Sequence, residues 1–359
     1  MSQGGAPGRG RRATMTDIAK LAGVSQSTVS LVINQVSGAK VSAQTRNKVL
    51  RIARELGYPV ERMGHLQPPH ARKLIVYLTD ELSTSPHAML TIDGARDAAW
   101  EHDCLLSVFA TRSDPEYEQA ILARVMADPA LLGVVYATIF TRAVTLPASL
   151  AQVPTVLLNC HPQDRRERLY SSVVPSEVLG GFAATMHLLD AGHRRIGLVN
   201  GEGWIEAAAE RLKGYRQALS TRDIPFDPAL VREGDWQVGT GHAHALALLA
   251  LPDPPTALFC ANDLMAVGAL EAVRERGMEV PRQVSVVGYD DQDIARYTQP
   301  PLTTVLLPNY EMGRWAAENL IAQVNGGVLR RTSVKMDCPL VERDSVASPS
   351  LPQAVFQSS

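Results

Sequence analysis

The spacing of apolar residues divides the chain into two differently patterned parts. Near the N-terminus, apolar residues recur at three- and four-residue intervals over short stretches, which predicts amphipathic helices. In the first of these, Ile18, Leu21 and Ala22 form the apolar face, Thr16 is the expected N-cap, and Gly23 is expected to end the helix. From residue 74 onward, short continuous apolar runs alternate with helical patterns, which indicates parallel sheets with covering helices.

Two further helices are predicted in the N-terminal part. The second runs from Gln26 to about Ile33, with Ser25 as its cap, and the third runs from a Ser42 cap to Leu56. The turn between the first two helices has about three residues and contains glycine, as in a helix-turn-helix. The second helix is expected to expose Gln26, Ser27, Thr28 and Ser30, short polar side chains that fit the major groove of DNA. A three-helix bundle without a nucleic-acid function is the alternative.

Charge separates the same two parts of the chain. Residues 1–73 contain twelve Lys or Arg and three acidic residues, a net charge of +9, whereas the remainder contains 23 basic and 34 acidic residues. The whole chain has a net charge of only −2. A basic N-terminal part on an acidic body indicates a polyanionic partner for that part alone. Without the leader arginines Arg9, Arg11 and Arg12 the excess is still +6, so a basic tail alone does not account for it.

Composition restricts the class of protein. Its 359 residues, 45% hydrophobic and 20% charged, are typical of a globular chain of two or three domains. The longest apolar runs fall short of the roughly 18 residues that span a bilayer, and the N-terminus shows no apolar signal region. Four cysteines lie far apart, which favours a reducing compartment and argues against zinc or disulfide frameworks. We therefore expect a cytoplasmic, nucleoid-associated protein.

The body is expected to form two α/β lobes, because the series of strands is too long for one sheet of ordinary size. Ligands in such folds bind at the carboxyl ends of the strands, so a cleft between the lobes is the expected site. Strands are predicted at 74–79, 105–110, 133–138, 154–159, 195–200, 230–234, 256–261 and 284–289. Helices are predicted near 88–102, 115–127, 176–191, 206–220, 238–250, 264–277 and 310–323.

Evidence for an enzyme is weak in this sequence. The GEG at 201–203 follows a predicted strand, but Glu206 stands where a dinucleotide fingerprint needs its third glycine. His242 and His244 lack an acidic or cysteine partner at metal-ligand spacing, and no nucleophile elbow, P-loop or HExxH motif occurs. We therefore predict no enzyme, no cofactor, no metal site and no catalytic residue. The alternative is a sugar- or nucleobase-binding protein, or a sugar-modifying enzyme, with an incidental basic head.

The N-terminal part closely resembles the DNA-binding head of LacI-family repressors over TMTDIAKLAGVSQSTVSLVIN and VSAQTRNKVLRIARELGY. The resemblance places Gln26 and Ser27 at the family's base-reading positions. It places Leu31 where many members have Arg, which leaves the operator half-site open because Leu can make only apolar contacts, such as with a thymine methyl. The candidate DNA contacts in this head are Thr16, Ser25, Gln26, Ser27, Thr28, Ser30, Leu31 and Asn34.

Residues 59–73 contain glycine and prolines without periodicity, which predicts a linker. In the LacI family the corresponding segment forms a short hinge helix on DNA and inserts a leucine into the minor groove. Here Leu66 is the candidate wedge, although the match requires a one-residue deletion after Tyr58. An exposed leucine in an inert linker is the alternative.

The body resembles the same family, and through it the periplasmic sugar-binding proteins, over LLDAGHRRIGLVNG, AAERLKGYRQAL, REGDW, ALFCANDLMAVGAL, VSVVGYDD and PPLTTV. This resemblance implies a two-lobed effector-binding domain. A guanidinium, an indole, amides and a carboxylate at these positions favour a carbohydrate over a nucleobase. The implied effector-binding residues are Arg211, Trp236, Asn262, Asp290 and Asn159, with Ser85 or His87 from the loop at 82–89.

The sequence thus predicts an α + α/β chain: a three-helix helix-turn-helix head, then a two-lobed periplasmic-binding-protein-like effector domain. The predicted segments are a disordered leader (1–13), DNA-binding domain (14–58), hinge (59–73), effector and dimerisation domain (74–345) and disordered tail (346–359). Residues 74–174 and about 302–325 are assigned to the first lobe, and 175–301 with the last strands to the second. Without a C-terminal heptad run, we expect a dimeric, ligand-responsive transcriptional repressor that binds a pseudo-palindromic operator.

Overall fold

The computed structural model describes residues 14–33, 41–56, 72–82, 87–164, 169–326 and 332–349. The chain divides into two compact units, residues 1–71 and 72–359. Each unit has a hydrophobic core of its own. The expected leader (1–13), residues 59–71 of the expected hinge and residues 350–359 of the expected tail lie outside the described residues.

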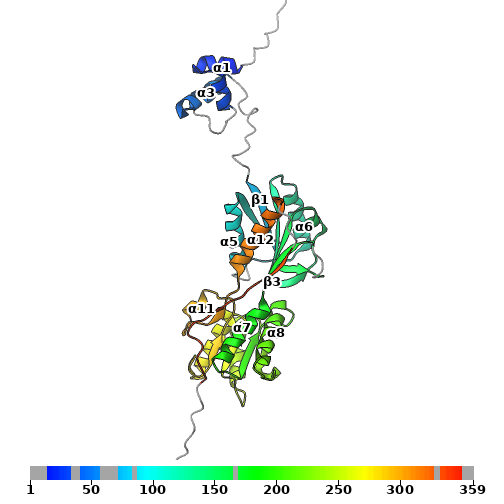
Figure 1. Ribbon diagram of the computed structural model, residues 1–359, viewed down its shortest axis with the longest axis vertical. Helices are drawn as coiled ribbons and strands as arrows, with labels where there is room; N and C mark the ends of the chain where they lie inside the picture. The colour runs from blue at the N-terminus through cyan, green and yellow to red at the C-terminus, as the bar shows by residue number, and fades with distance from the viewer. Residues whose placement is uncertain are drawn as a thin grey trace, which may run out of the picture. The chain divides into compact units, whose positions relative to one another are not determined.

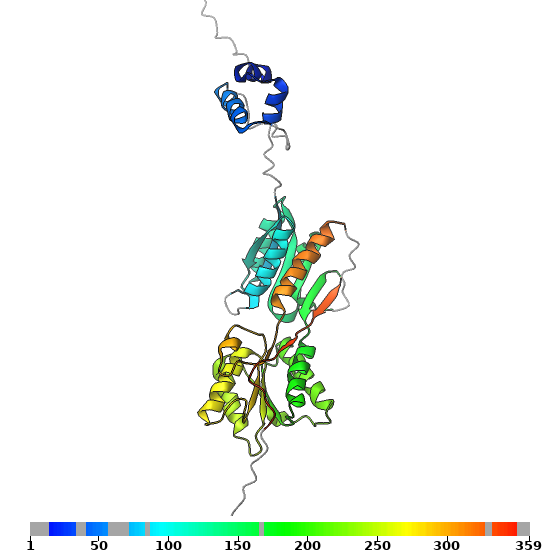
Figure 2. The same ribbon diagram turned by 60° about the vertical axis from the view of Figure 1, so that its left-hand side comes forward.

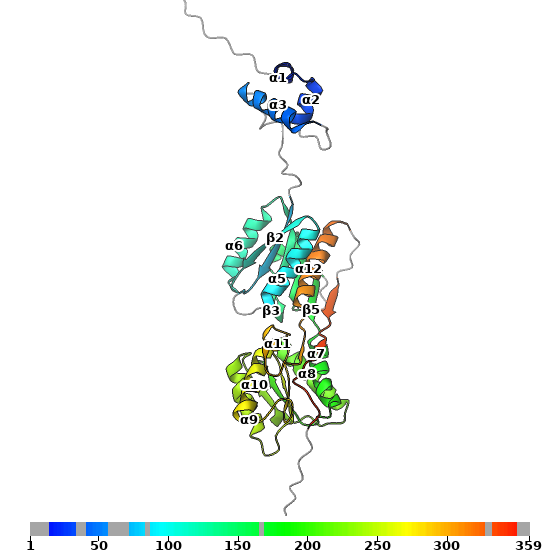
Figure 3. The same cartoon turned by 90° about the vertical axis from the view of Figure 1, so that its left-hand side faces the viewer.

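The N-terminal unit contains the three predicted helices, α1 (Met15–Ala22), α2 (Gln26–Ile33) and α3 (Ala43–Glu55), which pack against one another (Figure 3). Their apolar faces meet in one core, and α1 and α2 are joined by the short turn expected of a helix-turn-helix. The helix-turn-helix prediction is confirmed. The buried residues of this core are Ile18, Ala19, Ala22, Val29, Val32, Ile33, Val49, Ile52 and Ala53.

The start of α1 differs from the prediction. Thr14, not Thr16, is the N-cap: its hydroxyl accepts from the backbone N–H of Asp17 at 3.3 Å, and the Asp17 carboxylate accepts from the Thr14 N–H at 2.9 Å. This reciprocal capping box satisfies two backbone donors that the helix itself leaves unpaired. Leu21 is 58% exposed, because it lies to one side of the apolar stripe centred on Ile18 and Ala22.

The other ends of these helices agree with the sequence. Gly23 ends α1 with φ = +67°, a left-handed conformation that costs glycine little. The hydroxyl of Ser25 accepts from the N–H of Thr28 at 3.1 Å, and that of Ser42 accepts from the N–H of Thr45 at 3.1 Å. Ser25 and Ser42 therefore cap α2 and α3 as predicted.

The first lobe of the second unit is built on one six-stranded parallel sheet with the order β11–β5–β4–β3–β1–β2. Alternate residues of β1 face opposite sides: Ile75 and Tyr77 pack against α5 and α12, whereas Val76 and Leu78 pack against α6. The helices accordingly lie on the two faces of the sheet (Figure 1). The bounds are β1 Lys73–Thr79, α5 His87–Glu101, β2 Cys104–Ala110, α6 Pro115–Met126, β3 Leu131–Val144, β4 Thr155–Pro162, β5 Ser171–Pro175, α12 Asn309–Val324 and β11 Ser333–Met336.

The second lobe is a four-stranded parallel sheet with the order β7–β6–β8–β9. Helices α7 and α8 pack on one face and α9 and α10 on the other, as Figure 2 shows with green helices on one side and yellow ones on the other. The bounds are α7 Glu177–Asp190, β6 Ile196–Asn200, α8 Glu206–Ser220, β7 Val231–Glu233, α9 Val238–Leu249, β8 Ala257–Cys260, α10 Asp263–Glu275, β9 Ser285–Val287 and α11 Ile294–Tyr297.

The path of the C-terminal chain departs from the sequence-based assignment. The strand at Ser333–Met336, β11, pairs in parallel with β5 at the edge of the first sheet, so it belongs to the first lobe and not to the second. Two short strands, β10 (Thr304–Val305) and β12 (Leu340–Val341), pair antiparallel outside both sheets. The strands β5 and β10 were not predicted, and β11 and β12 were expected only as last strands without bounds. So few residues show no readable periodicity, and the partners of these strands are distant in sequence.

Residues 346–349, which the sequence assigned to the tail, are packed on the second lobe. The backbone N–H of Ala347 donates to the hydroxyl of Ser285 at 3.1 Å, and its carbonyl lies 2.9 Å from Nε2 of the buried His193. Val346 packs against the same core as α7 and α8. As for membranes, none of the helices within the described ranges combines the length and apolarity needed to cross one.

Candidate nucleic-acid interface and ligand cleft

The solvent-facing side of α2 carries the polar residues expected there. Gln26 and Ser27 are exposed, and Thr28, Ser30 and Leu31 are partly exposed. The hydroxyl of Ser25 lies 2.8 Å from both the Ser27 and Thr28 hydroxyls. These contacts join residues two or three positions apart. They therefore orient the start of α2 and do not depend on distant parts of the fold.

The remaining candidate DNA contacts divide between described and undescribed positions. Thr16 is exposed on the first turn of α1. Asn34 and Leu66 lie outside the described residues. Of the two candidate effector-binding residues in the loop at 82–89, Ser85 also lies outside the described residues. His87 is the first residue of α5, and its side chain also lies outside what the structure describes.

A cavity of about 360 Å³ opens between the two lobes of the second unit, within the range typical of small-molecule sites. All five cleft residues that the family resemblance implied line it, and residues from both lobes contribute. The lining residues are Ile139, Phe140, Thr141, Asn159, Pro175, Glu177, Glu202, Trp204, Ala207, Arg211, Asp235, Trp236, Gln237, Asn262, Leu264, Asp290, Gln292 and Leu307.

Arg211, on α8, is already engaged in a buried ion pair. Its Nε and Nη2 donate to the two carboxylate oxygens of Glu177 at 2.8 and 2.9 Å, its Nη1 donates to the Ala261 carbonyl, and Nη1 lies 3.7 Å from Asp290. Burial alone would lower the pKa of this guanidinium, but the Glu177 carboxylate reverses the effect and raises it. Arg211 and Glu177 are only 3% and 2% exposed. The guanidinium therefore links α8 to α7 in the wall of the cleft, and it also lines the cavity.

Glu177 is a site residue that the sequence reasoning missed. It is the first residue of α7 and follows Ser176, and an acid at a helix N-terminus is usually explained by the helix dipole alone. Its 34-residue separation from Arg211 gives no local signal of a pair. The packing of α7 against α8 is what brings the two side chains together.

Trp236 forms an aromatic contact across the cleft. Its ring is stacked against that of Phe140, with centroids 6.3 Å apart and planes 27° apart. Its indole N–H donates to Glu202 at 2.8 Å. A Cβ on Gly201 would lie 1.8 Å from the indole, so only glycine fits beneath the ring. The glycine that opens the GEG segment thus makes room for Trp236, and Phe140 is a second lining residue that the sequence reasoning missed.

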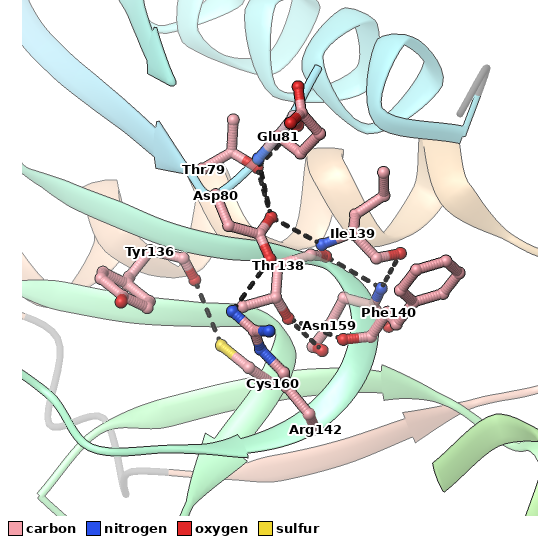
Figure 4. A network of polar contacts seen from close by, with 10 residues as sticks. All are labelled: Thr79, Asp80, Glu81, Tyr136, Thr138, Ile139, Phe140, Arg142, Asn159 and Cys160. Atoms are coloured by element: carbon pink, nitrogen blue, oxygen red, sulfur yellow. Dashed lines mark hydrogen bonds and ion pairs between the residues drawn. The ribbon is translucent and has the colours of Figure 1, made fainter. Parts of the chain in front are cut away.

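The side-chain amide of Asn159 is bonded within the first lobe, and Figure 4 shows its Nδ2 contacts with two backbone carbonyls. Its Nδ2 donates to the carbonyls of Thr138 and Ile139 at 3.0 and 3.1 Å, and its Oδ1 accepts from the Thr141 hydroxyl at 2.5 Å. Strand β3 shifts its pairing with β4 between Ala137 and Arg142. Asn159 therefore holds the irregular segment 138–141, which carries Phe140 and Thr141 into the cleft.

Asp80, which directly follows β1, supports the same segment. Its Oδ1 accepts from the Ile139 N–H at 3.0 Å, and its Oδ2 lies 3.0 Å from Nη2 of Arg142 (Figure 4). Burial raises the pKa of this carboxyl, and the Arg142 charge opposes that effect. Two polar side chains, Asp80 and Asn159, thus position the first-lobe wall of the cleft.

On the second-lobe wall, Asn262 and Asp290 are also bonded within the protein. The Asn262 side chain accepts from the Met265 N–H at 2.8 Å, which caps α10, and donates to the Trp236 carbonyl at 2.9 Å. The Asp290 carboxylate accepts from Nε2 of Gln292 at 3.2 Å. Behind it, Asp263 is fully buried and accepts from the Thr304 hydroxyl and the Gln292 N–H; burial and the nearby Asp290 raise its pKa.

Three of the implied cleft residues have an uncommon backbone conformation. The φ angles of Asn159, Trp236 and Asp290 are +58°, +67° and +106°. Positive φ is uncommon for residues other than glycine, and such residues concentrate at functional sites where the surrounding structure enforces them. Here the enforcing contacts are the hydrogen bonds and close packing described above, which turn these three side chains toward one cavity.

A metal centre finds no support in the part of the chain that the structure describes, where no three His, Cys, Asp or Glu side chains gather at ligand distance. His242 lies 2.7 Å from the Glu275 carboxylate, and His244 lies 2.8 Å from the Glu233 carbonyl. The two histidines thus have separate partners.

Both parts of the chain match known protein families. Residues 14–59 match the family of bacterial regulatory proteins called the lacI family, and residues 185–346 match the periplasmic binding protein-like domain. The chain is 32% identical over 339 residues to the ribose operon repressor of Haemophilus influenzae, covering 94% of this chain and 99% of that protein. The chain belongs to the LacI family. It is also 33% identical over 342 residues to the repressor CytR of Escherichia coli, covering 93% and 96% of the two chains.

Solved LacI-family structures agree with this placement. A complex of the transcriptional regulator CelR with cellobiose matches with a TM-score of 0.66 and 32% identity, covering 93% of this chain and all of that one. The Lac repressor dimer bound to operator and the anti-inducer ONPF matches with a TM-score of 0.69 and 27% identity, covering 94% and 100%. This LacI-family chain is a ligand-responsive, DNA-binding transcriptional repressor, and its relatives are repressors rather than enzymes.

Proposed function

We propose that this repressor binds a pseudo-palindromic operator as a homodimer in the cytoplasm, and that a carbohydrate in the cleft alters its affinity for DNA. The observation that carries the proposal is the combination, in one chain, of an exposed polar α2 face on a helix-turn-helix and a cavity lined from two lobes. One helix-turn-helix reads only a few base pairs, so useful specificity requires two heads on two half-sites. The complexes with operator and with cellobiose are consistent precedents in related proteins.

The cleft chemistry is compatible with a carbohydrate effector. Carboxylates accept hydrogen bonds from sugar hydroxyls, and an indole can pack against the C–H face of a sugar ring. Asp290 and Trp236 line the same cavity and supply these two groups. A ligand that contacts both lobes has different affinities for different lobe arrangements, and that difference is what couples the cleft to DNA binding.

DNA binding is tested by gel-shift titration of the purified protein against the promoter region of its own gene. We expect saturable, specific binding whose log affinity falls steeply with log salt, by about 0.9 for each phosphate neutralised. A duplex of the same length with scrambled half-sites is the control. Binding that ignores salt, or that prefers single strands, would contradict the proposal.

For the hinge, the proposal concerns Leu66. If it wedges into the minor groove, Leu66→Ala should weaken operator binding by at most a few kcal/mol, because unstacking a base step costs about that much. DNA bending, measured by circular permutation of the operator, should fall as well. Leu56→Ala, just beyond α3, is the matched control and should leave bending unchanged. Unaltered bending in Leu66→Ala would assign this leucine to an inert linker.

A further inference from the structure

We infer that the cleft selects an uncharged, polyhydroxylated ligand with a flat apolar face and discriminates against ligands that carry a phosphate or carboxylate. This inference rests on the proposed function, because it specifies the effector of that same site. It depends on the charges, the aromatic groups and the acceptor groups of the cleft.

The charged residues of the lining are predominantly acidic. Four acidic side chains, Glu177, Glu202, Asp235 and Asp290, line the cavity with one basic side chain, Arg211, for a net charge of −3. A hydrogen bond from Thr240 lowers the pKa of the Asp235 carboxyl, so this group is ionised at neutral pH. An anionic ligand would therefore enter against like charges in a partly desolvated space, where Coulomb repulsion is stronger than in water.

Arg211 does not supply a compensating positive charge. Its fork is bound by Glu177 through two hydrogen bonds, and its remaining terminal nitrogen lies 3.7 Å from Asp290. Outside the lining, Arg142 pairs with Asp80 at 3.0 Å, and Arg343 pairs with Asp291 at 2.5 Å. A phosphate or carboxylate in the cleft would compete with these acids for their guanidinium groups.

Three aromatic rings line the same cavity. Phe140 comes from the first lobe, whereas Trp204 and Trp236 come from the second. Trp204 is 75% exposed, which is unusual for so large an apolar side chain. Flat rings of this kind pack against the apolar face of a sugar or aglycone. Ile139, Leu264 and Leu307 extend the apolar part of the lining.

The lining contains four carboxylates beside amide and hydroxyl groups that can either donate or accept hydrogen bonds. The carboxyl oxygens of Glu202, Asp235 and Asp290 accept hydrogen bonds, so a ligand group that bonds to them donates. Hydroxyl groups donate, whereas phosphate and carboxylate oxygens at neutral pH only accept. The aromatic rings and the carboxylates of the cleft thus favour the same class of ligand.

The experiment compares uncharged ligands with charged derivatives of the same molecule. Glucose is measured beside glucose 6-phosphate and glucuronate, ribose beside ribose 5-phosphate, and adenosine beside adenosine monophosphate, with cellobiose as a further uncharged ligand. We expect one or more uncharged members to raise the Tm of the full-length protein, and the Kd of the charged counterpart, from isothermal titration, to be at least about tenfold higher. A charged member that binds as tightly as its uncharged partner overturns the inference, as does a failure of every uncharged member to bind.

Variants then test whether the cleft acids cause the discrimination. Glu202→Gln combined with Asp235→Asn removes two charges while keeping an acceptor oxygen at each position, and should bring the ratio of the two Kd values toward one. Glu271→Gln combined with Glu279→Gln removes two exposed acids of the second lobe outside the cavity lining and should leave the ratio unchanged. Equal ratios in the wild type and both variants would show that charge is not the cause.

Trp204→Ala tests the aromatic part separately. Because the side chain is largely exposed, folding should be unaffected, whereas the affinity for the uncharged ligand should fall with the charge discrimination retained. An unchanged affinity would remove Trp204 from the ligand contacts. Gel shifts without ligand should be the same for the wild type and the Glu271→Gln/Glu279→Gln control. Loss of operator binding by the wild-type protein would count against the proposed repressor function and not against the charge selectivity.

Discussion

The α2 face and the ligand cleft differ in what their side chains are bonded to. On α2, the hydroxyls of Ser25, Ser27 and Thr28 contact neighbours two or three residues away. In the cleft, Arg211 bonds to Glu177, 34 residues away, and to Ala261, 50 residues away. A surface whose contacts are local can change without disturbing the fold, whereas a site made of long-range contacts also holds the fold together. Substitutions should therefore separate binding from stability in the head and combine them in the cleft.

The strongest test of this difference is Arg211→Ala. It leaves the buried Glu177 carboxylate without its guanidinium, and breaking a buried pair in this way costs about 3–5 kcal/mol of folding free energy. Urea denaturation should show a lower midpoint for the full-length protein. Arg274→Ala, which removes an exposed pair with Glu271, should cost about 0–1 kcal/mol and is the control.

A double variant separates the two roles of Arg211. Arg211→Met with Glu177→Leu replaces the buried pair with apolar side chains of similar size, which is often neutral for stability. We expect the denaturation midpoint to recover, whereas the ligand response should be lost because no guanidinium then lines the cleft. Recovery of the ligand response as well would mean that Arg211 serves only to hold α7 and α8 together.

The next largest effect is expected for Asn159→Ala. This change leaves the carbonyls of Thr138 and Ile139 without their partner, at a cost of about 1–3 kcal/mol. It also releases the segment that carries Phe140, so ligand affinity should fall together with stability, and this indirect effect is separate from the direct contact that the family resemblance implies for Asn159. Titration calorimetry and denaturation of the same sample measure both losses. A drop in affinity at unchanged stability would make Asn159 a direct ligand contact instead.

In the head, Gln26→Ala should change binding alone. Losing a contact from a glutamine to a base edge costs about 1–3 kcal/mol of operator affinity, while the free energy of unfolding should stay within about 0.5 kcal/mol because Gln26 is exposed. Gel shifts and denaturation measure the two quantities. Gln44→Ala on α3 is a matched control for losing a glutamine elsewhere in the head. A destabilised Gln26→Ala would contradict the distinction between the two surfaces.

The smallest effect concerns pH. Burial lowers the pKa of the His193 imidazole below 6.5, and its contact with the Ala347 carbonyl opposes this shift. As the pH falls, the unfolded chain therefore binds a proton on this ring before the folded state does. Stability from this group is therefore complete above about pH 6.5 and decreases as pH falls below it, by at most about 1.4 kcal/mol per pH unit. His193→Gln should flatten this dependence in thermal melts between pH 5 and 7, whereas His244→Gln should not.

Much of the fold follows from local sequence features. The helices α1, α2 and α3 and most strands and helices of the body were predicted to within a few residues, because apolar periodicity, serine caps and Gly23 act over single turns. The cleft residues came from motif resemblance, and all five line one cavity. The elements that were missed or left without bounds, such as β5 and β11, are short strands whose pairing joins residues far apart in the sequence.

The roles of the cleft residues, by contrast, were decided only by the tertiary structure. The sequence by itself determined the helix-turn-helix, its basic charge and the alternation of strands and helices, since each depends on neighbours along the chain. It did not show that Glu177 neutralises Arg211, or that the Asn159 amide is occupied by the backbone of residues 138 and 139. Nor did it show that Phe140 meets Trp236 across the cleft. These contacts depend on how two lobes, built from interleaved pieces of chain, bring distant side chains within hydrogen-bonding or stacking distance, and no local pattern encodes that distance.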